Sequence, residues 1–198
     1  MDIYPVIVLT GGPCGGKTTL IDELSHDPTW VGRFAALPEA IFTLRNINIS
    51  PQERLFQRVM VQMQIALEDG LKHALEDEGP RLILCHRGSM DPLAYWLDRG
   101  WPEGEFFEYT ETNREMHFRR YSAVIHLVTA ADGAIEHYKK YPQAHRPETP
   151  QQAIQLDRLL QRVWSKHPRY FRIDNDGRDW SVKAGKAQKI LAQLYDEI

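Results

Sequence analysis

Residues 11–18 read Gly11-Gly-Pro-Cys-Gly-Gly16-Lys17-Thr18, which fits the phosphate-binding loop pattern G-x-x-x-x-G-K-[ST] without a mismatch. Glycines allow successive backbone N–H groups to turn inward and form a cradle for an anion. In such a loop the lysine reaches the β- and γ-phosphates, and the threonine hydroxyl completes the shell of a Mg²⁺ ion. The stretch therefore predicts nucleotide binding by Gly12, Pro13, Cys14, Gly15, Gly16, Lys17, Thr18 and Thr19, with Lys17 also catalytic and Thr18 also a metal ligand.

The segments on either side of this loop are expected to be a strand and a helix, which is the context that the motif requires. Upstream, Val6-Ile7-Val8-Leu9 is a continuous apolar run, which is typical of a parallel strand covered on both faces. Downstream, Leu20, Ile21 and Leu24 recur at helical spacing until Asp27-Pro28 ends the helix. The alternative is a glycine-rich turn that binds nothing, but such a turn needs neither the lysine nor the threonine.

The rest of the chain alternates between short apolar runs and amphipathic segments. Strands are expected at 5–10, 33–37, 81–85, 123–128 and 170–173, and helices at 17–26, 51–78, 91–100, 104–120, 150–166 and 180–198. This alternation predicts an α/β protein, a three-layer α/β/α sandwich around a five-stranded parallel sheet with right-handed crossovers. No repeat or long linker divides residues 1–198, so a single domain is expected.

Two of these helices begin at capping boxes, one from Ser50 to Glu53 and one from Thr149 to Gln152. The helix after the first box is expected to bury one apolar face, formed by Leu55, Val59, Met63, Leu67, Leu71 and Leu75. The charged helix at 104–120 could pair with a copy of itself in a homodimer or could be solvated.

Composition excludes several classes of protein. The net charge of −3 offers no basic field for nucleic acid or an anionic membrane. No apolar stretch approaches the roughly 20 residues of a membrane span, and the N-terminus lacks a signal-peptide plan, so a cytoplasmic protein is expected. Cys14 and Cys85 are expected to be reduced thiols. A redox switch at Cys14 is the less favoured alternative, because it requires a depressed pKa.

Ligands of parallel α/β sheets bind at the carboxyl ends of the strands. The residues that follow the five expected strands should therefore face one another on one rim. They are Gly11–Thr18, Pro38-Glu39, His86-Arg87-Gly88, Thr129-Ala130 and Asp174-Asn175.

Three charged residues on or near this rim are candidates for chemistry. Glu39 could act on Mg²⁺ or as a base for a substrate hydroxyl, or it could be only the acid of a helix first turn. Arg87 could stabilise charge on a transferring phosphoryl group. Asp91 could orient Arg87 or a substrate, or it could be only a helix cap before Pro92.

Between the fourth strand and the penultimate helix, the segment 138–146 is basic, polar and poorly periodic. It could be a lid that closes over phosphate, within about 132–150, or a solvated loop. Arg146 is the catalytic candidate there, with Arg158 and Arg162 behind it on one helical face.

Other positions carry weaker signals. Phe42, Arg45, Asn46 and Asn48 mark the place where an acceptor with a nucleoside-like ring could sit, or they could only pack. The histidines show no zinc spacing and are interpreted as structural or surface residues: His73, His117, His126, His137 and His167.

Several short motifs occur in one order along essentially the whole chain. They are Gly11–Thr19, Leu37-Pro-Glu39, Cys85-His-Arg-Gly88 with Asp91, Arg146-Pro-Glu148-Thr149, Ala153, Leu156-Asp157, Trp164, His167-Pro168 and Ile173-Asp174-Asn175. Together they resemble a family of P-loop nucleotide-binding proteins classed as AAA-type ATPase domains. It includes the ribosylnicotinamide-kinase domain of an NAD-biosynthesis regulator and the nucleotide-binding domain of the TRPL translocation defect protein.

The resemblance implies a nucleoside- or nucleotide-kinase-like fold with a lid. It places Lys17 and Thr18 at phosphate and Mg²⁺, Arg87 near the transferred phosphate, Arg146 in the lid, and Asp174 and Asn175 near the nucleotide base. One departure stands out, because the family has an acid before the arginine after the third strand and this chain has His86. Either Glu39 then supplies the metal contact, or catalysis is slower, or the protein mainly binds nucleotide.

These observations favour a Mg²⁺-dependent phosphotransferase that moves a phosphoryl group from ATP or GTP to a small hydroxyl- or phosphate-bearing acceptor. The alternative is a nucleotide-binding switch or slow NTPase that acts through a protein partner. A nucleic-acid repair kinase is disfavoured by the acidic net charge. No base-reading motif separates ATP from GTP.

Overall fold

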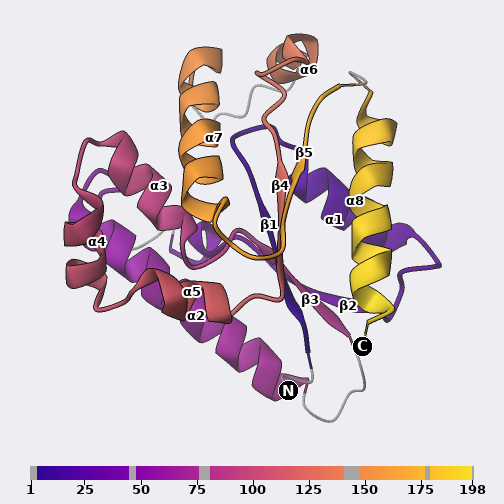
Figure 1. Ribbon diagram of the computed structural model, residues 1–198, viewed down its shortest axis with the longest axis horizontal. Helices are drawn as coiled ribbons and strands as arrows, with labels where there is room; N and C mark the ends of the chain where they lie inside the picture. The colour runs from indigo at the N-terminus through magenta and orange to yellow at the C-terminus, as the bar shows by residue number, and fades with distance from the viewer. Residues whose placement is uncertain (1–3, 45–47, 76–80, 141–147, 177–178, 198) are drawn as a thin grey trace.

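A computed structural model describes residues 4–44, 48–75, 81–140, 148–176 and 179–197. Five strands form one parallel sheet in the order β2-β3-β1-β4-β5 (Figure 1). The strands are β1 (Val6–Thr10), β2 (Phe34–Leu37), β3 (Leu82–His86), β4 (Ala123–Leu127) and β5 (Tyr170–Ile173). All of the expected strands are confirmed, each with its bounds displaced by no more than one residue.

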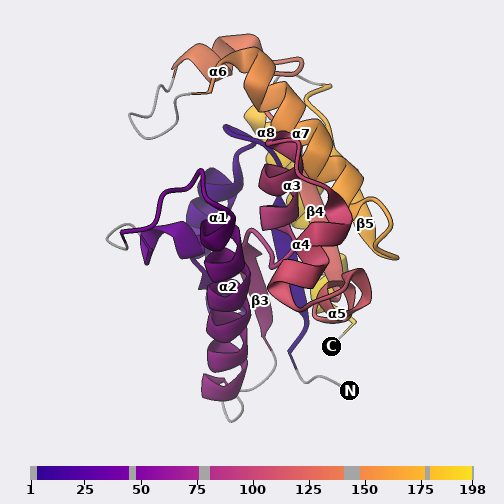
Figure 2. The same cartoon turned by 90° about the vertical axis from the view of Figure 1, so that its left-hand side faces the viewer.

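Helices cover both faces of the sheet (Figures 1 and 2). In β1, Ile7 and Leu9 pack into an apolar core with α1 (Lys17–His26) and α8 (Trp180–Tyr195). Val6 and Val8 point to the opposite core, because successive strand residues alternate between faces. That second core involves α2 (Arg54–Ala74), α3 (Asp91–Asp98), α4 (Glu103–Thr110), α5 (Arg114–Arg119) and α7 (Pro150–Trp164). The expected three-layer α/β/α fold is thereby confirmed.

The expected single helix at 104–120 is wrong, because the segment folds as α4 and α5. Glu111 adopts a φ of 57°, a left-handed conformation that ends α4. Asn113 then caps α5, and its side chain accepts a hydrogen bond from the Met116 N–H at 2.9 Å. The long helix expected at 104–120 is therefore not available for self-pairing, and the homodimer stays a prediction.

The two capping boxes have different outcomes. At α7, the side chains and backbone N–H groups of Thr149 and Gln152 bond reciprocally, which confirms the box. At the other box, the Ser50 N–H donates to Glu53 Oε1 at 3.0 Å, but these residues form a turn and α2 begins only at Arg54.

The buried face of α2 differs from the expected one. Leu55 is 42% exposed, and the rest of the apolar stripe up to Leu71 is only partly buried. The most deeply buried positions include Gln57, Gln64 and Glu68. These polar side chains find partners on neighbouring segments, since Gln64 donates to the Arg87 carbonyl after β3 and Glu68 accepts from the Tyr121 hydroxyl ahead of β4.

Two short helices were not expected. The 3₁₀ helix η1 (Ala40–Phe42) follows Glu39, and α6 (Ile135–Lys140) lies beyond the carboxyl end of the sheet (Figure 1). Among the described residues, no helix combines the length and apolarity that crossing a membrane requires.

Candidate active site

The backbone of the phosphate-binding loop is held in a conformation that its glycines allow. Gly11 and Gly16 have φ angles of 127° and 96°, and even Cys14 has a φ of 56°. A Cβ atom on Gly11 would lie 2.0 Å from the Leu127 carbonyl oxygen, so β4 packs directly against the loop. The loop is therefore a preformed concave turn between β1 and α1.

Lys17 lies at the centre of this turn, as the first residue of α1. Its Nζ donates to the carbonyl oxygens of Gly11 at 2.8 Å and Gly12 at 3.0 Å. These carbonyls hold the ammonium group inside the loop, where the oxygens of a bound phosphate could replace them as its hydrogen-bond acceptors. Thr18 and Thr19 follow in the exposed first turn of α1, where the helix N-terminus favours anions.

Asp157 on α7 hydrogen-bonds to the phosphate-binding loop. Its Oδ1 accepts hydrogen bonds from the N–H groups of Gly12 at 2.6 Å and Thr129 at 3.1 Å. His126 Nε2 lies 3.1 Å from the same oxygen. Burial would raise the pKa of Asp157, but these partners, His126 foremost, lower it to about 2. The sequence analysis did not single out Asp157 as a site residue, and its only signal was its place in a family motif.

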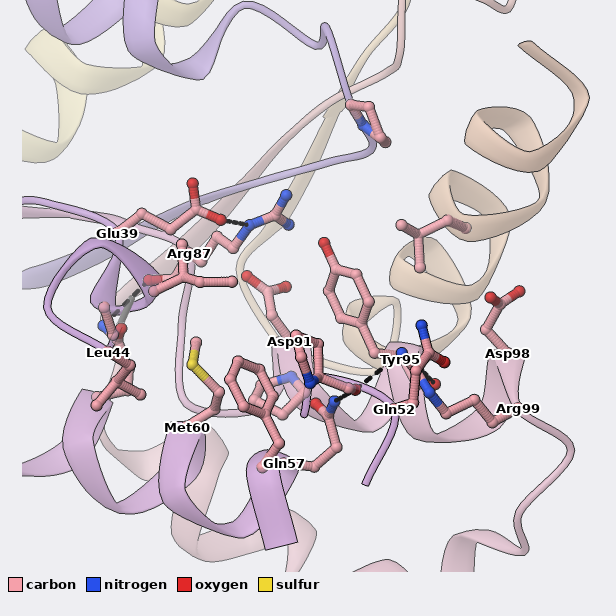
Figure 3. Close-up of a pocket in the computed structure, with 18 of the residues that line it drawn as sticks. Glu39, Leu44, Gln52, Gln57, Met60, Arg87, Asp91, Tyr95, Asp98 and Arg99 are labelled. Atoms are coloured by element: carbon pink, nitrogen blue, oxygen red, sulfur yellow. Dashed lines mark hydrogen bonds and ion pairs between the residues drawn. The ribbon is translucent and has the colours of Figure 1, made fainter. Parts of the chain in front are cut away.

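Glu39 and Arg87 are brought together from the ends of β2 and β3. Arg87 Nε donates to Glu39 Oε1 at 2.6 Å (Figure 3), and the two side chains are only 8% and 12% exposed respectively. Although burial acts to raise it, Arg87, His86 and Lys17 lower the pKa of Glu39 to about 2. Glu39 makes no capping hydrogen bond to η1. It is therefore an ionised acceptor that faces the site.

The Arg87 backbone has a φ of 78°, which is strained for a residue with a side chain. Its N–H donates to the Leu9 carbonyl at 3.0 Å, and its carbonyl accepts from Gln64 Nε2 at 3.2 Å. Two residues on, the Ser89 N–H donates to the Tyr121 hydroxyl oxygen at 2.6 Å. The chain around Arg87 is thus held by groups from other elements.

Glu68 connects two of these supports. Its Oε1 accepts from Gln64 Nε2 at 2.9 Å and from the Tyr121 hydroxyl at 2.7 Å. Its Oε2 accepts from Arg120 Nε at 2.9 Å. The pKa of Glu68 is raised by burial, against the opposing charge of Arg120. Gln64, Glu68 and Tyr121 were not predicted from the sequence, and only the shared helical face of Gln64 and Glu68 on α2 could have signalled those two.

The hydrogen bonds of the Asp91 side chain go to the turn between β3 and α3 and to the neighbouring elements, and none of those described goes to Arg87. Its Oδ2 accepts from the Gly88 N–H at 3.0 Å. Its Oδ1 accepts from Thr10 Oγ1 at 2.6 Å and Trp164 Nε1 at 2.9 Å. Each oxygen is engaged, so Asp91 fastens the turn between β3 and α3 to β1 and α7.

His86 stands where the resemblance noted from the sequence leads us to expect an acid, and it lies between two predicted metal ligands. Its Nε2 lies 3.1 Å from Thr18 Oγ1, and its Nδ1 lies 3.6 Å from Glu39 Oε2. Within the described ranges, no three His, Cys, Asp or Glu side chains cluster as a metal site. Mg²⁺ with a nucleotide needs only one or two protein groups beside phosphates and waters, so Thr18 with Glu39 nearby fits that ion.

A pocket of about 900 Å³ extends from Pro13 in the phosphate-binding loop past Glu39 and Arg87 (Figure 3). Its walls combine apolar side chains with amides and a phenol, among them Leu44, Phe56, Gln57, Met60 and Tyr95. Burial raises the pKa of Tyr95 to about 12, so its hydroxyl is protonated and can donate. The volume falls within the roughly 300–1,000 Å³ of small-molecule sites.

The residues expected to hold an acceptor are only partly placed. Phe42 lines the pocket, whereas Asn48 is not among the lining residues. Arg45 and Asn46 lie outside the described residues.

Asp174 and Asn175 follow β5 and are engaged within the protein. Asp174 forms a two-point ion pair with Arg172, with separations of 2.6 and 2.7 Å. Asn175 Nδ2 donates to the Thr129 carbonyl at 2.8 Å, and its Oδ1 accepts from Lys183 Nζ at 2.9 Å. A role near the nucleotide base stays a prediction for both residues.

Part of the predicted lid at 132–150 is described. It contains α6, and the Tyr138 hydroxyl donates to the Glu148 carbonyl at 2.8 Å. Arg146 lies outside the described residues, while Arg158 and Arg162 are exposed on α7. The catalytic role of Arg146 therefore stays a prediction.

Comparison with known proteins agrees with this geometry. A family model described as an AAA domain matches residues 6–180. That match spans most of the chain, so the chain belongs to this family of P-loop nucleotide-binding domains. A search of curated proteins returned no match.

Solved structures show the same fold. Two structures of deoxyadenosine kinase from M. mycoides, one with the products dCMP and a flexible dCDP and one with dATP, each match with a TM-score of 0.57. Each shares 15% sequence identity with this chain, and each match covers 95% of this chain and 99% of the kinase chain. The likeness identifies the fold as that of a P-loop nucleoside kinase.

Proposed function

We propose that this protein is a Mg²⁺-dependent P-loop phosphotransferase that moves the γ-phosphoryl group of ATP or GTP to a hydroxyl group of a small, nucleoside-like acceptor. The observation that carries the proposal is that the phosphate-binding loop contributes to the wall of the pocket of about 900 Å³. Pro13, Glu39 and Arg87 all line that pocket. The fold shared with a deoxyadenosine kinase also supports an acceptor of this class.

The residues have distinct roles in this reaction. Phosphoryl transfer requires mainly positioning and charge stabilisation, because its transition state is loose. Lys17 leaves the loop carbonyls and neutralises the transferring oxygens, while Arg87 contributes a second positive charge beside them. The Thr18 hydroxyl, with Glu39 on the other side of His86, would hold Mg²⁺, which when bound would supply neutralisation of phosphate charge.

Glu39 aligns the acceptor hydroxyl by accepting its hydrogen bond. Since the pKa of Glu39 is lowered to about 2, it is a weak base before reaction. It takes the proton only as the acceptor oxygen bonds to the γ-phosphorus, while the bond from that phosphorus to the bridging oxygen breaks and the nucleoside diphosphate leaves. Arg146 is proposed to close from the lid over the phosphates, and the site is proposed to operate in the cytoplasm.

The test is nucleotide turnover measured with a panel of nucleosides and deoxynucleosides. We expect at least one acceptor to stimulate turnover, and Glu39→Gln to remove that stimulation with little loss of nucleotide affinity. Glu53→Gln, which alters an exposed carboxylate outside the pocket, serves as the control. Failure of every acceptor to stimulate turnover would contradict the proposal.

A second candidate is a nucleotide-binding switch or slow NTPase with a protein partner. The observation that favours it is His86, which replaces the acid of the family pattern. This alternative predicts nucleotide binding without any acceptor that fits beside Glu39, so the same panel distinguishes the two functions.

A further inference from the structure

We infer that the divalent cation bound with the nucleotide takes His86 Nε2 as a ligand beside Thr18 Oγ1, with Glu39 behind the imidazole rather than on the metal. Nitrogen ligation would raise the affinity for ions such as Mn²⁺ or Co²⁺ relative to Mg²⁺, compared with a site of oxygen ligands alone, while Mg²⁺ could still bind. The inference rests on the proposed function, because it concerns the cation of a bound nucleotide.

The spacing of the two donor atoms is the first argument. Two ligands that lie about 2.1 Å from one cation and at right angles to each other are about 3 Å apart. Thr18 Oγ1 and His86 Nε2 are separated by 3.1 Å. The hydrogen bond between them can therefore be exchanged for two bonds to one cation without moving either side chain far.

The surroundings of the imidazole are the second argument. Ligating histidines commonly present their other ring N–H to a carboxylate, which fixes the tautomer. Glu39 Oε2 lies 3.6 Å from His86 Nδ1, so a shift of a few tenths of an ångström would close that hydrogen bond. Only 6% of the His86 side chain is exposed. The ring is thus held with its Nε2 toward Thr18 and its Nδ1 toward a carboxylate.

The chemistry of the donors sets the metal preference. Mg²⁺ selects oxygen ligands, whereas imidazole suits the first-row transition metals. The donor that faces Thr18 Oγ1 is an imidazole nitrogen and not a carboxylate oxygen. It also leaves Glu39 paired with Arg87 at 2.6 Å, where the acceptor pocket needs it.

The decisive experiment is pulsed electron paramagnetic resonance of Mn²⁺ bound to the full-length protein with ATP, and separately with GTP. We expect modulation from a directly bound ¹⁴N, replaced by the ¹⁵N pattern when histidine alone is labelled. His26→Asn, which alters an exposed histidine at the far end of α1, should keep the modulation, and His86→Asp should lose it.

The outcomes separate the two proposals. Mn²⁺–nucleotide that binds with no histidine nitrogen coupling overturns the ligand assignment and leaves the phosphotransferase intact. Absence of nucleotide binding overturns both. If His86→Asp does not fold, the absence of histidine coupling in the unaltered protein still overturns the assignment, and His86→Gln serves as a second variant that should lose the coupling.

Metal competition provides a readout without spectroscopy. We measure nucleotide affinity in the presence of Co²⁺ and of Mg²⁺. The nucleotide affinity with Co²⁺, divided by the affinity with Mg²⁺, should be about tenfold lower in His86→Asp than in the unaltered protein. Changes of this size are common when the environment of a metal is altered. An equal ratio in the two proteins would refute nitrogen ligation.

Discussion

Asp157 Oδ1 accepts a hydrogen bond from the Gly12 N–H at 2.6 Å, across 145 positions of the sequence. The contact joins α7 to the phosphate-binding loop. It also occupies the Gly12 N–H, so we expect the loop's anion-binding N–H donors to come from the residues that follow. Asp157 is thus a positioning residue for the nucleotide site.

Asp157→Asn should weaken both folding and nucleotide binding. The amide keeps the size of the side chain but lacks the charge that strengthens hydrogen bonds from Gly12 and Thr129. We expect the free energy of unfolding to fall by about 1–3 kcal/mol, and nucleotide affinity to fall with it. Denaturant unfolding and calorimetric titration measure the two effects. Asp176→Asn, at an exposed ion pair with Lys186, should change neither, and equal behaviour of the two variants would contradict the role.

Lys17→Ala should abolish most of the binding of Mg²⁺-ATP and Mg²⁺-GTP. The ammonium is already centred on the loop by Gly11 and Gly12, and a charge-assisted contact contributes about 1.5–3 kcal/mol, or at least about tenfold in affinity. Titration calorimetry with both nucleotides checks this and shows the preferred base. Lys186→Ala is the control for loss of a surface lysine, and retained affinity in Lys17→Ala would exclude phosphate binding by this loop.

Tyr121→Phe should destabilise the turn that carries Arg87. The change removes the acceptor of the Ser89 N–H and a donor to Glu68, so the free energy of unfolding should fall by about 1–3 kcal/mol. Because the Arg87 backbone would relax, acceptor-stimulated kcat should fall while nucleotide affinity stays constant.

Tyr170→Phe is the matched control for this effect. The Tyr170 hydroxyl is buried and lacks a hydrogen-bond partner among the described residues. Its removal should be neutral or stabilising. Similar losses in the two variants would show that Tyr121 contributes only packing.

Stability should decline between pH 6.5 and pH 4 through His117. Burial, with a smaller contribution from Arg120 and Arg114, lowers the pKa of His117 from 6.5 to about 4. In this window His117 is protonated in the unfolded chain but stays neutral in the folded protein. The free energy of unfolding therefore falls as the pH falls. The slope from one such proton is at most about 1.4 kcal/mol per pH unit.

His117→Gln should flatten this slope in denaturant unfolding measured across the window. His26→Gln, at an exposed position, should leave the slope unchanged. A steep slope that persists in His117→Gln would assign the effect to other groups.

The sequence alone determined the sheet and the loop. Apolar runs such as Val6–Leu9 predict buried parallel strands, and the spacing from Gly11 to Thr18 predicts an anion cradle. Both depend on residues that are neighbours in the chain, so local pattern is sufficient. The placement of Glu39 and Arg87 on one rim also followed, because parallel strands end at one edge, but their ion pair was not predicted.

Only the tertiary structure decided which polar groups support that site. Asp157, Gln64, Glu68 and Tyr121 lie on helices or at a strand start, and their partners are tens of residues away in the sequence. A buried polar residue is stable only where a distant segment supplies its hydrogen bonds. Sequence periodicity does not contain that information, so α2 was expected to bury an apolar stripe where it buries Gln64 and Glu68.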